Sequence, residues 1–147
     1  MEKFNYSGNA EILHLNTRKE GPDEDKVLAA DVKLRVVTDK SVMNFFEPLL
    51  SDVLFLDSGA VRNIRLNPIT FSHELEHYHL ETFGRSFVGC KVKRFELAPK
   101  DVNQITLTFQ VSFKPSGDEV ARLAEFLQDS VAVRIEPETG DLLKEEK

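Results

Sequence analysis

The sequence contains one cysteine and no tryptophan, and no apolar run approaches the roughly 18 residues that a membrane-spanning helix needs. A lone cysteine excludes an internal disulfide, and the first residues lack the pattern of a signal peptide. We therefore expect a cytoplasmic protein with no membrane partner. Cys90 lies among Phe87, Val88 and Val92, which favours a buried structural thiol over a reactive one.

Basic residues are also scarce, since 19 Lys and Arg face 25 Asp and Glu, for a net charge of −6. This balance disfavours a large nucleic-acid footprint, which usually needs a basic face, but it leaves room for a local basic patch. Hydrophobic residues at 41% and charged residues at 30% are typical of a globular chain. The length predicts one β-rich domain over residues 1–147, with a loose start at about 1–9 and a charged, frayed tail at about 137–147.

Alternation of apolar and polar residues predicts several strands. The clearest covers 102–113, and 27–37 shows the same period of two. A third strand covers 87–97, where the apolar phase changes near Lys93-Arg94, as a β-bulge would produce. The stretch 87–113 therefore reads as a hairpin.

Shorter elements complete the pattern. Short strands are expected at 11–15, 60–66 and 131–135. A helical stretch begins at Ser41 and is interrupted by Pro48, and another helix follows a cap at Ser116 or Asp118. Strands and helices do not alternate regularly, which predicts a mainly antiparallel β fold with one or two short helices. A β-sandwich is the first choice and a partly open β-barrel the second.

One motif could carry chemistry. His73-Glu74-Leu75-Glu76-His77 has the H-E-x-x-H spacing of zinc hydrolases, in which both histidines bind Zn²⁺ and Glu74 activates the bound water. The chemistry requires a helix, because on a strand the two histidines would stand about 13 Å apart. The flanking pattern favours a strand, so we expect no catalytic residue, metal or cofactor here. The zinc hydrolase remains an alternative.

A second metal hypothesis survives a strand. His77 and His79 are two residues apart, share a face, and could hold a metal with a third ligand from a neighbouring strand. A half-exposed, histidine-rich sheet face is the simpler interpretation. His73, His77 and His79 are therefore only alternative metal ligands.

Two charged stretches are candidates for partner binding. Residues 17–26 contain no apolar side chain, carry both signs of charge, and predict an exposed, hairpin-like loop. The 87–114 hairpin has a local basic character, so a single-stranded nucleic-acid platform is a further alternative. The candidate partner-binding residues are Arg18, Lys19, Glu20, Lys91, Lys93 and Arg94.

Two segments carry a resemblance to a known group. Residues 18–24 with 27–34, and residues 45–55 with their Phe-Phe-Glu-Pro-Leu-Leu start, resemble small uncharacterised proteins of tailed bacteriophages and prophages, encoded near recombination and early-region genes. The resemblance covers mainly residues 11–55. It implies an early protein that acts in the host bacterial cytoplasm by binding, and it implies no catalytic residues.

These observations favour a non-enzymatic binding protein. The sequence lacks a glycine-rich phosphate loop, a nucleophile elbow and a cysteine with an obvious base. We expect a protein or nucleoprotein partner, as for an accessory of recombination or replication or an inhibitor of a host or defence protein. An exposed sheet edge would also permit a homo-oligomer.

Overall fold

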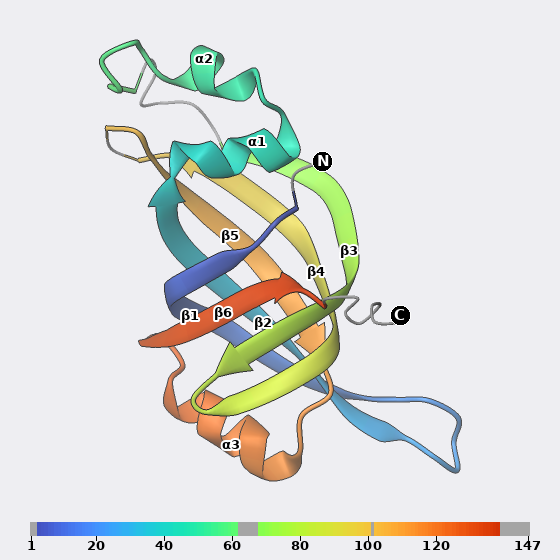
Figure 1. Ribbon diagram of the computed structural model, residues 1–147. Helices are drawn as coiled ribbons and strands as arrows, with labels where there is room; N and C mark the ends of the chain where they lie inside the picture. The colour runs from blue at the N-terminus through green and yellow to red at the C-terminus, as the bar shows by residue number, and fades with distance from the viewer. Residues whose placement is uncertain (1–2, 62–67, 101, 139–147) are drawn as a thin grey trace, which may run out of the picture.

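The computed structural model describes residues 3–61, 68–100 and 102–138, and these contain six antiparallel strands in one sheet. The strands are β1 (Tyr6–Glu20), β2 (Val27–Asp39), β3 (Ile69–Thr82), β4 (Arg85–Pro99), β5 (Gln104–Phe113) and β6 (Ser130–Pro137). Their order is β1-β2-β5-β4-β3-β6, and β6 also pairs with β1 (Figure 1). The mainly antiparallel β fold with short helices is confirmed. We expected a sandwich ahead of a partly open barrel, and the strand order is that of a closed barrel.

Short helices lie at the two ends of the barrel (Figure 1). The 3₁₀ turn η1 (Lys40–Val42) and helices α1 (Met43–Phe46) and α2 (Leu50–Leu54) lie at one end, and α3 (Gly117–Glu125) lies at the other. The break between α1 and α2 falls at Pro48, as predicted. Ser116 begins α3 with a capping box: its hydroxyl accepts from the Glu119 N–H at 3.2 Å, and the Glu119 carboxylate accepts from the Ser116 N–H at 2.9 Å.

Side chains fill the interior of the barrel. The inward residues of β5 are fully buried, among them Ile105, Leu107, Phe109 and Val111. A pocket that lies between the strands, lined by Ile12, Leu34 and Val111 among others, measures about 10 Å³. Ligand pockets need roughly 300–1,000 Å³. Binding sites are therefore to be sought on the outer surface.

Two bulges change which side chains face inward. On β4 the register with β5 shifts between Lys93 and Glu96, and Arg94 has φ 60°, so the predicted bulge is confirmed. On β3 a second bulge lies at His77, which has φ 62°. In the sequence, His77 and His79 fall in the same alternating phase as Phe71 and Leu75, which predicts that all four share one face of the strand. That expectation is wrong, because the bulge turns Tyr78 and Leu80 inward instead.

The loose start is also a wrong prediction for the residues described. β1 begins at Tyr6, and the ring of Phe4 is 1% exposed, with its centroid 5.3 Å from that of Phe95 and 5.5 Å from that of Phe109. The Tyr78 hydroxyl donates to the Phe4 carbonyl at 2.8 Å. Burial of the ring holds Phe4 and the start of β1 against the barrel. Most of the strand expected at 60–66, and the tail at 139–147, lie outside the described residues.

Candidate functional site

The β1–β2 hairpin, whose tip carries residues 21–26, projects from the barrel (Figure 1). Its base lies close to β4, because only β5 stands between β2 and β4 in the sheet. Asp31 on β2 is opposite Ser112 on β5, and Ser112 is opposite Lys91 on β4. Neighbouring strands lie about 4.8 Å apart, so side chains from β2 and β4 on the outer face come within reach of the same ligand.

A cleft of about 380 Å³ opens where the base of the hairpin meets β4 and β5. We call it the cationic cleft, and its charged lining residues are Arg18, Glu20, Lys91, Lys93 and Lys114. Apolar surface adjoins these charges. Ala29 lies in the lining, and Val88 at its margin is 72% exposed. The cleft thus combines excess positive charge with a small apolar contact.

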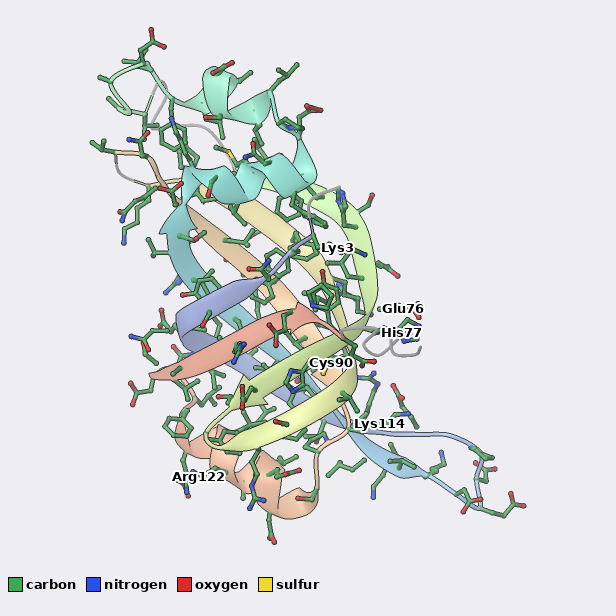
Figure 2. The ribbon with its side chains drawn as sticks, viewed as in Figure 1. Lys3, Glu76, His77, Cys90, Lys114 and Arg122 are labelled. Carbon is green, nitrogen blue, oxygen red and sulfur yellow. The ribbon has the colours of Figure 1, made fainter. Side chains whose placement is uncertain are left out.

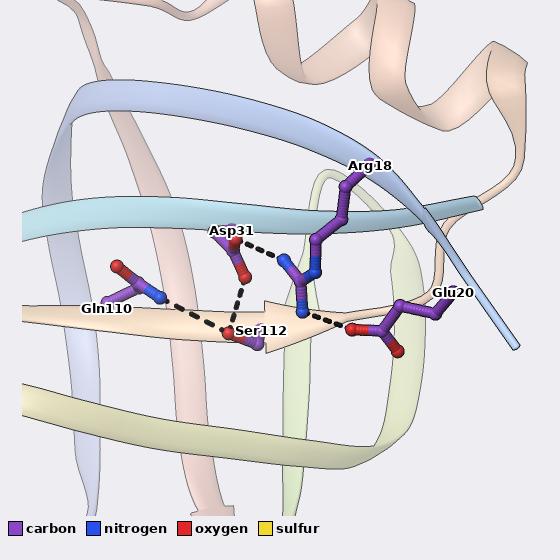
Figure 3. Close-up of polar contacts among 5 residues, drawn as sticks. All are labelled: Arg18, Glu20, Asp31, Gln110 and Ser112. Carbon is purple, nitrogen blue, oxygen red and sulfur yellow. Dashed lines mark hydrogen bonds and ion pairs between the residues drawn. The ribbon is translucent and has the colours of Figure 1, made fainter.

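A hydrogen-bond network fixes one side of the cationic cleft (Figure 3). The Arg18 guanidinium donates to the carboxylates of Asp31 and Glu20, and the Ser112 hydroxyl donates to Asp31 Oδ1 at 2.6 Å. Gln110 Nε2 donates to Ser112 Oγ at 3.4 Å. This chain orients Arg18 across the base of the hairpin and largely compensates its charge.

The same network determines the protonation of Asp31. Burial acts to raise the pKa of this carboxyl, but hydrogen bonds from Arg18 and Ser112, together with the charges of Arg18 and Lys93, hold the pKa below its usual value. Hydrogen bonds to Asp31 and then Glu20 raise the pKa of Arg18 in turn. Asp31 is therefore a carboxylate at neutral pH and a weak base.

The lysines of the cationic cleft carry the charge that a ligand can use. Among the described residues, no ion pair joins Lys91, Lys93 or Lys114 to a carboxylate. Lys114 lies close to the start of the projecting hairpin (Figure 2). These three lysines, none of which forms an ion pair with a described carboxylate, border one concave surface.

A second cleft, of about 350 Å³, continues along the outer face. Its lining includes Lys33, Gln110 and Arg94, which the β4 bulge places there. Lys33 and Lys93 oppose Gln110 from its two sides, so the positive surface is continuous between the clefts. Lys33 was not among the predicted partner-binding residues, although the alternation in the sequence already placed it on the outward face of the strand at 27–37.

The six predicted partner-binding residues are thus distributed over neighbouring surfaces. Arg18, Glu20, Lys91 and Lys93 border the cationic cleft, and Arg94 borders the second one. The sixth residue, Lys19, is exposed on the hairpin and lines neither. The sequence suggested two separate contact surfaces, and the strand order brings them together.

The histidine motif lies on strand β3, so the helix that a zinc hydrolase requires is not formed. His73 points to the aromatic rings of Phe45 and Phe46, with ring centroids 5.3 Å away in both cases, and its buried Nδ1 has no hydrogen-bond partner in the described residues. Glu74 is exposed on the other face and is opposite Lys93 on β4. The helical arrangement of His73, Glu74 and His77 is therefore contradicted.

His77 lies at the β3 bulge and His79 lies beyond it, so neither continues the face of His73. His77 is exposed there and projects outward (Figure 2), and His79 Nδ1 lies 3.6 Å from the Glu136 carboxylate. Within the described ranges, no three His, Cys, Asp or Glu side chains are grouped to hold a metal ion.

Cys90 is fully buried, and burial raises the pKa of its thiol to about 12. It therefore stays protonated at neutral pH, and its prediction as a buried structural thiol is confirmed.

No protein-family model, curated protein or solved structure matches the chain. Among the helices that the structure describes, none is both long and apolar enough to span a bilayer. The interpretation of the candidate site is therefore based on the geometry of the cationic cleft alone.

Proposed function

We propose that the protein is a non-enzymatic binding module that holds an acidic surface of a partner protein in the cationic cleft. The observation that carries the proposal is the convergence of Lys91, Lys93 and Lys114, without carboxylate partners among the described residues, on one cleft of about 380 Å³. Clustered charges of one sign attract and orient a ligand of the opposite sign.

The chemistry of the cleft supports binding over catalysis. A general base works best with a pKa near the operating pH, whereas the pKa of Asp31 is lowered by its hydrogen bonds. Its oxygens are also engaged by Arg18 and Ser112. The lysines supply positive charge, which suffices for recognition of carboxylates.

The surroundings of the cleft support a protein partner over a nucleic acid. Among the described residues, the exposed large apolar side chains are aliphatic, whereas the aromatic rings that line the two clefts are buried or half-buried and offer little face for base stacking. Val88 instead offers an aliphatic contact beside the lysines. The net charge of −6 also opposes long polyanions.

The biological setting in this proposal follows from the resemblance to phage early proteins. The partner would then be a protein of the bacterial cytoplasm, either in recombination or replication or in host defence. An acidic partner surface fits each of these settings equally, so the first test concerns the chemistry of the ligand.

The test uses a fluorescein-labelled peptide rich in glutamate and leucine, followed by anisotropy at low and high salt. Lys91→Glu/Lys93→Glu is expected to weaken binding at least about tenfold, because each reversal replaces an attraction by a repulsion. Lys100→Glu, an exposed lysine outside both clefts, is the matched control and should bind like the parent.

Three outcomes would overturn the proposal. They are absence of salt-dependent binding by the parent protein, an equal loss with Lys100→Glu, and tighter binding of an oligo(dT) strand than of the peptide. The last result would instead favour the single-stranded nucleic-acid alternative.

A further inference from the structure

Strand β6 is shorter than the two strands that it joins. It has 8 residues, whereas β1 has 15 and β3 has 14. Its pairing with β3 begins at Tyr78 opposite Pro137 and continues to Thr82. The first half of β3 pairs with β4 on one side only, and no described strand pairs with its other side. Figure 1 shows this part of β3 beyond the point where β6 ends.

Burial along β3 follows the same division. The inward side chains of Phe71, His73 and Leu75 are half-buried, whereas Tyr78 and Leu80, which β6 flanks, are 5% and 3% exposed. Among the described residues, this half of β3 therefore lacks a strand partner on one side, and its inward side chains are partly exposed. We call residues 69–76 the open edge of β3.

Side-chain contacts cover the inner side of this opening, where the ring of Phe46 on α1 stacks on Phe71 with a centroid distance of 4.6 Å. The Tyr78 hydroxyl donates to the Phe4 carbonyl at 2.8 Å, which links β3 to the N-terminal segment through a side chain instead of a backbone ladder. The Glu138 N–H donates to the His77 carbonyl at 2.9 Å, immediately beyond the open edge. On the side of β3 that faces β6, backbone pairing among the described residues thus ends at His77.

We propose that the open edge of β3 binds an extended segment of a partner protein as an added strand. In this partner segment, basic residues alternate with apolar ones. Main-chain hydrogen bonds give such complexes affinity, and alternate side chains give them specificity. Apolar residues of the added strand would lie beside Phe71, His73 and Leu75. This inference concerns a different surface from the cationic cleft and does not rest on it.

Charge on the outer face determines the kind of segment. The outward residues of the open edge include Glu74 and Glu76, both exposed, and Glu76 projects from the barrel (Figure 2). Opposite charges on directly neighbouring strands are favourable and like charges are unfavourable. Lys or Arg in the outward positions of an added strand would therefore be selected. Lys93 on β4 already lies opposite Glu74, so Glu76 is the carboxylate that should attract the basic residues of the segment more strongly.

A second copy of the chain fits the open edge less well. Antiparallel pairing of two such edges would bring Glu74 and Glu76 of one copy close to the same carboxylates of the other, which opposes dimerisation. Sheet edges commonly avoid self-pairing through charges of this kind. The occupant that complements the edge is a basic segment of a different protein.

The test uses an eight-residue peptide of alternating lysine and valine, with amide chemical shifts and hydrogen exchange read by NMR on the full chain. Binding should slow exchange of edge-facing amides within residues 69–76 and leave those in the cationic cleft unchanged. A peptide of the same composition with lysines and valines in separate blocks should bind at least about fivefold more weakly, because its side chains cannot alternate.

Variants separate this surface from the cationic cleft. Glu76→Lys should weaken binding of the alternating peptide about fivefold to tenfold, while Glu125→Lys on α3 should leave it unchanged. Lys91→Glu/Lys93→Glu should also bind the alternating peptide at least as tightly as the parent. Equal binding of the two peptides, absence of binding, or slow exchange at 69–76 that arises from self-association without peptide would each overturn the proposal.

Discussion

Replacing Phe4 by alanine removes a ring from the core of the barrel, where it contacts aromatic rings of α1, β3, β4 and β5. The ring is 1% exposed and lies within 6.4 Å, centroid to centroid, of five other rings. A buried aromatic side chain removes roughly 150–250 Å² from water, worth about 4–6 kcal/mol at about 25 cal/mol per Å². Measured Phe→Ala losses in cores are about 3–5 kcal/mol. We expect Phe4→Ala to lower the free energy of unfolding by about 4 kcal/mol.

The assay is urea unfolding followed by far-ultraviolet circular dichroism, since the chain has no tryptophan. The midpoint should fall with little change in slope, and the melting temperature should drop by about 8–16 °C, at 2–4 °C per kcal/mol for a chain of this size. The neighbouring Asn5→Ala, at an exposed position, is the control and should stay within about 0.5 kcal/mol. A loss below about 1 kcal/mol for Phe4→Ala would refute the argument and restore the loose start expected from the sequence.

Three further predictions follow from single contacts. Because the pKa of Asp31 lies below its usual value of about 3.9, its carboxylate stabilises the fold above about pH 4 and loses this contribution as pH falls through the folded pKa. Asp31→Asn should therefore cost about 1 kcal/mol at pH 7 and flatten the acid limb of a stability–pH curve; superimposable acid limbs would contradict this. Cys90 should react with a thiol reagent only at the rate of unfolding, so rapid labelling of the native protein would show an accessible thiol. Ser116→Ala should cost about 1 kcal/mol by removing the cap of α3, whereas Ser116→Asp should retain most of the stability in the same urea titration.

The strands that could be predicted from the sequence are those whose apolar residues alternate over most of their length. β2 and β5 belong to this group, and so does β4, where even the bulge at Lys93-Arg94 was visible as a change of phase. Alternation reports burial on one face directly, and here tertiary contacts agree with the local pattern.

The start of β1 and the bulge in β3 could not be predicted by the same means. Residues 7–9 read Ser-Gly-Asn, which is typical of a loop, and they become a strand because β6 pairs with them. The bulge at His77 is a non-glycine residue with positive φ, for which the sequence gives no local signal. In both cases, a partner that is distant in sequence decides the conformation.

The candidate site was predictable in its parts and not in its assembly. The charge of Arg18 was visible in an expected exposed loop, and that of Lys91 on an outward position of an expected strand. Their approach depends on β5 lying between β2 and β4, which is a matter of strand order and register. Sequence patterns specify faces well, but they do not specify which strands become neighbours.

The closing strand has a consequence for the order in which the chain folds. β6 is synthesised after the other five strands of the described barrel, yet it pairs with β1 and β3 together. A nascent chain that has not reached Ser130 carries two uncovered strand margins, which are sites of association between unfinished chains. Pairing between opposite ends of a chain is also slow to form. Only when β6 is complete to Pro137 can it cover both margins in its paired stretch.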